Sequence, residues 1–147
     1  MIFLGIIFAG TFLYFYFNPS YRLSLEAKYF YEIGEYEKAY KLAHKAYLLN
    51  PYNKMAFTIE TQSKIAKEWQ RFIDDFDNYF TDIEKIANKP YISEKDKLRI
   101  KIMLEILLDE YKMLKPSLLL PKDLKEAAKI RYEKARELYE KLFGSRS

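Results

Sequence analysis

Apolar and polar residues follow two patterns along this chain. The first stretch, Met1–Phe17, carries no charged side chain. Further along, apolar residues recur at spacings of three and four, the period of an amphipathic α-helix. This second pattern covers residues 20–50, 55–86, 93–115 and 121–143. No segment alternates apolar and polar residues between turn signals, so the pattern predicts an all-α fold.

The apolar stretch Met1–Phe17 ends at Asn18-Pro19. It reaches the lower limit of the roughly 17–25 residues that a membrane-spanning helix needs. No Lys or Arg precedes it and bulky aromatic residues fill its end, whereas a cleaved signal peptide has a basic start and a small-residue cleavage site. A buried core helix is the alternative, although a domain of this size rarely hides a helix that is apolar on every side. The stretch therefore predicts an uncleaved transmembrane anchor at residues 1–18, followed by one domain at residues 19–147.

The charges beside this stretch suggest an orientation. Arg22 and Lys28 follow it, and only the α-amino group precedes it. Basic residues favour the cytoplasmic side of a membrane, and the absence of cysteine fits a reducing compartment. The expected location is thus a single-pass membrane protein whose remaining chain is cytoplasmic.

Two short helices are expected between Leu25 and Asn53. Gly34 can adopt the positive φ that ends a helix, and Pro51 suits the first turn of the next one. Small residues lie where two helix axes must approach closely: Ala27, Ala39, Ala43 and Ala46. Such a hairpin cannot bury its own apolar face, so it needs neighbours.

This unit resembles the tetratricopeptide repeat over residues 20–53. The resemblance is carried by Ala27, Phe30, Gly34, Tyr36, Ala39, Ala46, Leu49 and Pro51 and covers one repeat of about 34 residues. Leu23 stands where the family usually has an aromatic residue. The resemblance implies a stack of about three helical hairpins over residues 19–147 and a groove that binds a protein.

In this family the first helix of each repeat lines the groove. Carried over, the implied protein-binding residues are Tyr21, Ser24, Lys28 and Tyr31, and one period later Met55, Thr58 and Gln62. Lys28 stands where members that clamp a peptide's terminal carboxylate have asparagine, so another kind of peptide or a helix is expected. Alternatively, later helices fill the groove and these residues belong to the core.

A stripe with one helical face runs from Met55 to Ile86. It includes Ile65, Trp69, Phe72, Phe76, Tyr79 and Ile83. A second repeat would turn near Lys67-Glu68, but the stripe keeps its phase there, so one long helix is the alternative.

Two further helices are expected. Ser93 with Asp96 three residues on indicates a helix start of the capping-box type, and Pro116 ends that helix. Pro121 suits the start of the last helix. The first of these helices has an unusually broad apolar surface, which suggests that it is covered on more than one side.

Candidate chemistry is sparse. The chain has no cysteine and one histidine, His44. The acidic group Asp74, Asp75, Asp77, Asp82 and Glu84 lacks the central glycine of a calcium loop and lies off the apolar stripe. No nucleophile motif or glycine-rich phosphate loop is present. The sequence predicts no catalytic residue, cofactor or metal.

Charge adds little to this interpretation. The chain carries 25 basic and 21 acidic side chains, a net +4. Glutamates interleave with the basic residues of the last helix at salt-bridge spacing, so no nucleic-acid partner is expected.

Two functions fit the sequence. The first is a membrane-anchored, tetratricopeptide-like adaptor or scaffold that binds a protein partner without catalysis. The second is a structural subunit of a membrane complex, a possible homo-oligomer that self-associates through its aromatic stripe at residues 65–86.

Overall fold

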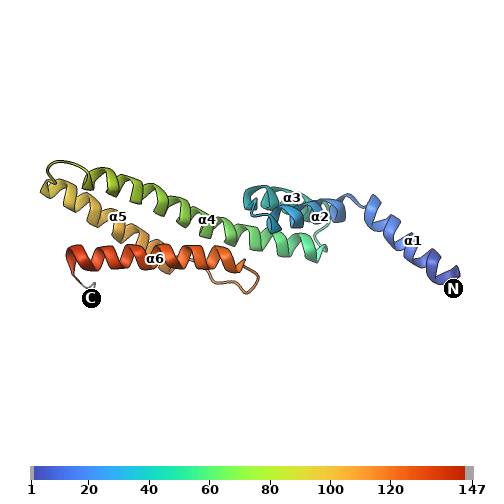
Figure 1. Cartoon of the computed structure of the whole chain (residues 1–147). Helices are drawn as coiled ribbons and strands as arrows, with labels where there is room; N and C mark the ends of the chain where they lie inside the picture. Colours follow the sequence, from blue (N-terminus) through green and yellow to red (C-terminus); the bar gives the residue numbers. More distant parts are fainter. Residues whose placement is uncertain (1, 145–147) are drawn as a thin grey trace. The chain divides into compact units, whose positions relative to one another are not determined.

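The computed structural model describes residues 2–144, and the outermost residues of the predicted anchor and domain, 1 and 145–147, lie outside it. The described chain is all-helical, as predicted, and contains six helices and no strand. These helices are α1 (Ile2–Phe17), α2 (Pro19–Glu32), α3 (Tyr36–Leu49), α4 (Lys54–Ala87), α5 (Glu94–Met113) and α6 (Lys122–Phe143) (Figure 1). They form two compact units, residues 1–67 and residues 68–147, here called the N-terminal and C-terminal units.

The predicted transmembrane anchor at residues 1–18 is wrong. Within the described residues, no helix combines the length and the apolar character that crossing a bilayer requires. Helix α1 has 16 residues, which gives a length of about 24 Å against a hydrocarbon core of about 30 Å. It cannot continue into α2, because Asn18 leaves the helical conformation and its side chain caps α2 by accepting a hydrogen bond from Ser20 N at 3.1 Å.

The expected single-pass membrane location is therefore wrong as well. The cytoplasmic side was an inference from the charges that flank this helix, and it loses its basis together with the anchor.

The N-terminal unit contains a tight α2–α3 hairpin. Gly34 has φ +84° at its turn, and its backbone N–H donates to Tyr31 O at 3.2 Å. The predicted small residues lie in the seam and are fully buried: Ala27, Ala39, Ala43 and Ala46. Ile59 of α4 joins Ala27, Ala39 and Ala43 in what we call the N-terminal core cluster. The small side chains let the helices pack closely.

Helix α4 decides between the two interpretations of the Met55–Ile86 stripe. It is one helix of 34 residues without a turn at Lys67-Glu68, so the alternative with a single long helix is right. The expected stack of three hairpins is thus wrong beyond the first hairpin. The sequence offered no glycine at this position to end the helix, and the apolar stripe keeps its phase through it.

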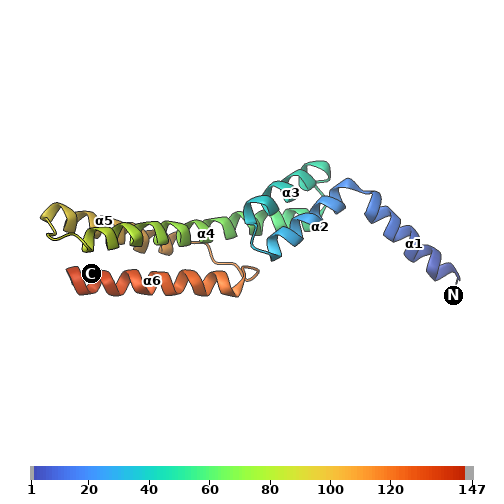
Figure 2. The ribbon, with the colours of Figure 1, turned by 45° about the horizontal axis from the view of Figure 1, so that its top comes forward.

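The C-terminal unit is built from the second half of α4 together with α5 and α6, which run alongside it (Figure 2). Its core consists of the aromatic residues of the stripe and aliphatic residues of α5 and α6, among them Trp69, Phe72, Phe76, Leu104, Leu107 and Ala128. Trp69 Nε1 donates a hydrogen bond to Lys115 O at 2.9 Å, which ties the α5–α6 loop to α4. The loops of this unit span residues 88–93 and 114–121.

Candidate protein-binding surface

Ser24, one of the residues implied to line the groove, lies in the core. It is fully buried beside Ser20 and Asn53. Asn53 Nδ2 donates to Ser20 Oγ at 2.9 Å and to Ser24 Oγ at 3.2 Å. The hydroxyl of Ser20 donates to Ala46 O at 2.8 Å. This polar cluster therefore joins α2, α3 and the start of α4, and it leaves Ser24 no role on a surface.

Tyr31 and Met55, also implied to line the groove, are partly buried. Both are half-buried and pack against the N-terminal core cluster. The ring of Tyr31 lies 5.5 Å from that of Tyr36 in an edge-on arrangement. Burial, with a smaller contribution from Tyr36, raises the pKa of Tyr31 to about 12. The alternative that these residues belong to the core describes their position best.

The remaining implied residues lie at or near the surface. Lys28 is exposed and pairs with Glu32 at 3.7 Å. Thr58 is exposed, and Tyr21 and Gln62 are half-buried. The structure thus brings Ser24, Tyr31 and Met55 together as core and leaves the other four around them, so the implied set does not form one continuous lining.

The outer face of α2 is a surface that the sequence analysis missed. Leu25, Tyr29 and Ile33 follow one another at intervals of four residues and are 54, 58 and 53% exposed. They lie opposite the face that α2 buries through Ser20, Ser24 and Ala27. The signal was present in the sequence as a second apolar stripe with helical spacing, but the alanine seam accounted for only one face of the helix.

Charged and aromatic residues of α3 and α4 form a polar seam in the same unit. His44 Nδ1 lies 2.8 Å from Glu60 Oε1, and its ring stacks on Tyr40 with 5.9 Å between centroids. Lys67 forms an ion pair with Glu37 and lies 4.9 Å from the centre of the Tyr40 ring. These contacts hold α3 against α4. No group of three or more metal-ligating side chains occurs among the described residues.

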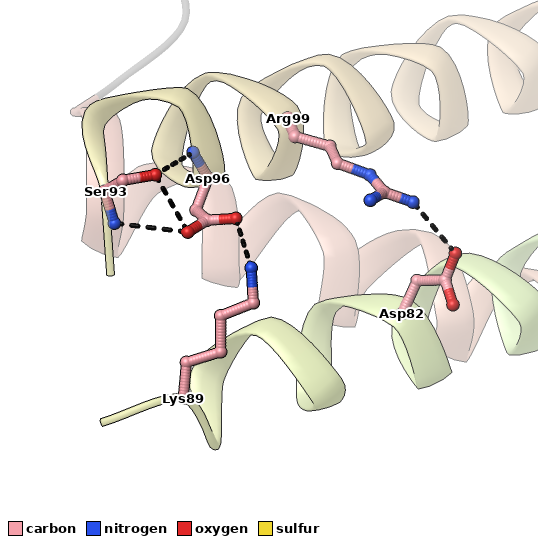
Figure 3. A network of polar contacts seen from close by, with 5 residues as sticks. All are labelled: Asp82, Lys89, Ser93, Asp96 and Arg99. Atoms are coloured by element: carbon pink, nitrogen blue, oxygen red, sulfur yellow. Dashed lines mark hydrogen bonds and ion pairs between the residues drawn. The ribbon is translucent and has the colours of Figure 1, made fainter. Parts of the chain in front are cut away.

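The acidic residues of α4 and α5 are used for pairing between helices of the C-terminal unit (Figure 3). Asp96 N donates to Ser93 Oγ at 3.1 Å, and Ser93 N donates to Asp96 Oδ2 at 3.2 Å, which confirms the predicted capping box. Lys89 Nζ donates to Asp96 Oδ1 at 2.7 Å. The hydrogen bonds from Lys89 and Ser93 lower the pKa of Asp96 to about 2. Arg99 Nη2 lies 3.4 Å from Asp82 Oδ2.

This network has a structural explanation. Its carboxylates satisfy a helix N-terminus and pair with basic residues across the α4–α5 turn (Figure 3). Such an arrangement fixes the loop, and it engages the carboxylates of Asp96 and Asp82 in contacts with Lys89 and Arg99. The best candidate site of the molecule is therefore the apolar outer face of α2.

Comparisons with known proteins gave no match. No family model fits the chain, and neither a curated protein nor a solved structure is significantly similar to it.

Proposed function

We propose that this protein is an interaction module that binds an amphipathic helix of a partner protein through the outer face of α2. The observation that carries the proposal is the exposure of Leu25, Tyr29 and Ile33 in one row on a helix whose opposite face is fully packed. A row of large apolar side chains at one-turn spacing is the usual anchor pattern for a docked helix. Tyrosine is well suited to this use, because its ring supplies apolar contact area and its hydroxyl stays hydrated.

The packing of the hairpin supports this proposal. A helical hairpin of the repeat type has two faces that seek a neighbour. In the N-terminal unit one face of α2 is covered by α3 and α4 through Ala27, Ser24 and the N-terminal core cluster. The other face has the composition of a packed surface but is open. The resemblance of residues 20–53 to the tetratricopeptide repeat supports a protein as the ligand.

The rim of this surface carries both signs of charge. Arg22 and Glu26 are exposed on one flank of this row, and Lys28 pairs with Glu32 on the other flank. A balanced rim gives no preference for a strongly acidic or basic partner. Recognition would then rest mainly on the burial of Leu25, Tyr29 and Ile33, with the charges setting the register.

The second function suggested by the sequence loses support. Self-association through the aromatic stripe requires side chains that are accessible to another chain. Trp69, Phe72 and Phe76 are buried within the C-terminal unit, which counts against the stripe as a contact between chains.

Site-specific photocrosslinking in cells that make the protein tests the proposal. A photoreactive phenylalanine analogue replaces Tyr29, and the matched control replaces Tyr52, which is 90% exposed in the turn before α4. We expect one distinct heterologous adduct from position 29 and not from position 52. The adduct should disappear when Leu25 and Ile33 are both changed to serine.

Two outcomes would contradict the proposal. The first is the same set of adducts from positions 29 and 52, which would indicate contacts without specificity. The second is an adduct that persists in the Leu25→Ser, Ile33→Ser variant. Since both side chains are largely exposed, the thermal unfolding of this variant should stay close to that of the unaltered protein, which separates loss of binding from loss of fold.

A further inference from the structure

The α5–α6 loop, residues 114–121, presents apolar side chains directly to water. Leu118 is 100% exposed and Leu119 is 58% exposed. We call these two leucines the loop tip. Met113, the last residue of α5, where the loop begins, is 73% exposed as well. The chain itself leaves these large apolar side chains uncovered, which marks the loop as a place for contact with something else.

Contacts on both sides of the loop tip hold its backbone. Before the tip, Trp69 Nε1 donates to Lys115 O at 2.9 Å. After the tip, Leu120 is 3% exposed and belongs to the core of the C-terminal unit. Within the loop, Leu119 N donates to Ser117 Oγ at 3.2 Å. The fold therefore presents the loop tip in a fixed position, and little conformational freedom is lost when the tip is covered.

The chain around the loop tip is basic. Residues 111–122 contain three lysines and no acidic residue. The lysines are Lys112 on α5, Lys115 in the loop and Lys122 at the start of α6, and all three are exposed. None of them forms an ion pair with another described residue. Positive charge thus lies on both sides of the loop tip along the chain.

The acidic residues nearest to the loop are balanced by other groups. An open hollow of about 310 Å³ between α4 and α5 is lined by two acidic and two basic side chains: Glu68, Glu110, Arg71 and Lys115. Asp123 lies in the first turn of α6, where it complements the positive end of the helix dipole. Lys112 and Lys122 are therefore the charges that are left to attract a partner.

We propose that the loop tip binds the surface of a lipid bilayer that contains anionic lipids. Leu118 and Leu119 enter the boundary between headgroups and acyl chains, and Lys112 and Lys122 lie beside lipid phosphates. Burial of apolar side chains and attraction of lysines to an anionic surface both favour this contact. It lies at the bilayer surface and needs no segment that crosses the bilayer. It concerns the C-terminal unit and does not depend on the proposed function of α2.

The exposure of Leu118 favours a bilayer over a protein as the partner. Since Leu118 is fully exposed, a protein would have to supply a pocket that encloses the whole side chain, whereas acyl chains adapt to any protruding shape. Positive charge on both sides of the loop tip also suits a plane of negative charge. Two leucines and two lysines form a weak anchor, so we expect reversible binding.

Fluorescence from one position in the loop of the full chain tests this contact. The chain contains no cysteine, so Leu119→Cys carries a single environment-sensitive dye and leaves Leu118 in place. Tyr91→Cys is the matched control, because Tyr91 is 77% exposed in the loop at the other end of α5. Helix α1 also exposes apolar side chains such as Phe12. Total binding of the chain to vesicles would therefore not isolate the loop, whereas the dye reports its own surroundings.

Vesicles of phosphatidylcholine and phosphatidylserine are the probe. We expect the emission of the dye at position 119 to shift to shorter wavelength and to be quenched by lipids that carry a nitroxide near the headgroup end of an acyl chain. The dye at position 91 should show neither change. With phosphatidylcholine alone, the lipid concentration for a half-maximal shift at position 119 should be about tenfold higher, because the lysines lose their partners.

Substitutions separate the apolar and the charged contributions. Lys112→Gln and Lys122→Gln together should raise the lipid concentration for a half-maximal shift about tenfold with phosphatidylserine present and leave it unchanged with phosphatidylcholine alone. Lys95→Gln with Lys141→Gln is the matched control, because both lysines are exposed at the far ends of α5 and α6. Leu118→Ser should raise the concentration about tenfold with either vesicle. All five side chains are exposed, so circular dichroism should show an unchanged fold.

Three results would overturn the proposal. Equal responses from positions 119 and 91 would show insertion without specificity. The absence of a response at position 119 would exclude the bilayer and leave a pocket of a partner protein as the occupant to seek. A response at position 119 that is the same with and without phosphatidylserine would remove the lysines from the contact and exclude an anionic surface as its target.

Discussion

The guanidinium of Arg131 on α6 donates two hydrogen bonds to the carboxylate of Asp77 on α4. They run from Nε to Oδ1 and from Nη2 to Oδ2, and both are 2.9 Å long. The two residues are 54 positions apart in the sequence. The same guanidinium lies 5.8 Å from the centre of the Phe76 ring. Because the fork geometry fixes both distance and direction, this pair sets how α6 aligns on α4 within the C-terminal unit. The hydrogen bonds from Arg131 to Asp77 raise the pKa of the arginine above its usual range.

Replacing Arg131 should weaken the C-terminal unit. We expect Arg131→Gln to lower the free energy of unfolding by about 1 kcal/mol, since the bidentate pair is partly exposed to solvent. Urea unfolding followed by fluorescence of Trp69, the single tryptophan of the chain, measures the change. Arg136→Gln is the control, because Arg136 reaches Glu140 only at 3.8 Å and both are half-exposed. An equal loss in the free energy of unfolding for the two variants would show that the Arg131–Asp77 pair stabilises the unit no more than the Arg136–Glu140 pair does.

Among the polar residues of the N-terminal unit, Asn53 should be the one whose replacement lowers the free energy of unfolding most. Its Oδ1 accepts a hydrogen bond from Ala56 N at 3.2 Å and caps α4. Its Nδ2 donates hydrogen bonds to the buried hydroxyl groups of Ser20 and Ser24. Asn53→Ala removes the cap and leaves buried hydroxyl groups with fewer partners, so we expect a loss of about 2 kcal/mol. Asn50→Ala is the matched control, because Asn50 makes one exposed bond to Tyr52 N. Thermal unfolding by circular dichroism compares them, and similar losses would contradict the role of the buried cluster.

The pH dependence of stability should include a contribution from Asp96. Its pKa is lowered from 3.8 to about 2 in the folded state by Lys89 and Ser93. A lowered folded-state pKa stabilises the fold above the ordinary value and loses this effect as the pH falls through the folded-state value. Asp96→Asn should therefore be less stable than the unaltered protein at pH 6, and the difference should shrink between pH 4 and pH 2. A difference that stays constant over this range in urea unfolding would refute the assignment.

Ionised Glu110, in contrast to Asp96, should destabilise the folded state. Its Oε2 is buried without a hydrogen-bond partner, and burial, then the charge of Asp75, raises the pKa of this carboxyl. A raised pKa means that the ionised form is penalised in the folded state, so the penalty applies at neutral pH and disappears on protonation. We expect Glu110→Gln to raise the melting temperature at pH 7 and to have little effect at about pH 4. A lower melting temperature at pH 7 would show that the ionised carboxylate is needed.

Local signals predicted the local structure of this chain well. Gly34 and the alanines at 27, 39, 43 and 46 defined the α2–α3 hairpin, because a positive φ and a close helix approach each favour particular residues. Ser93 with Asp96 defined the start of α5 for a similar reason. Such features depend on neighbours within a few positions, which the sequence displays directly.

Predictions from the sequence were wrong where contacts between residues far apart in the sequence decide whether a side chain is buried. Ser24 is polar and has the spacing of a groove residue, but it pairs with Asn53, 29 positions away. That partner turns a surface residue into a core residue, and nothing near Ser24 in the sequence reveals it. The anchor failed for a more local reason, because the apolar composition continues to Phe17 while the capping geometry of Asn18 stops the helix at 16 residues.

The sequences of the two loops of the C-terminal unit determine which proteases can cleave them. Lys89 precedes Pro90 and Lys115 precedes Pro116, and trypsin cleaves poorly where proline follows the basic residue. The same loops expose Tyr91 and Leu118, which suit a protease that prefers large apolar side chains, and exposed loops are where nicking concentrates. The turns between the helices of this unit are thus shielded from one class of protease and open to another.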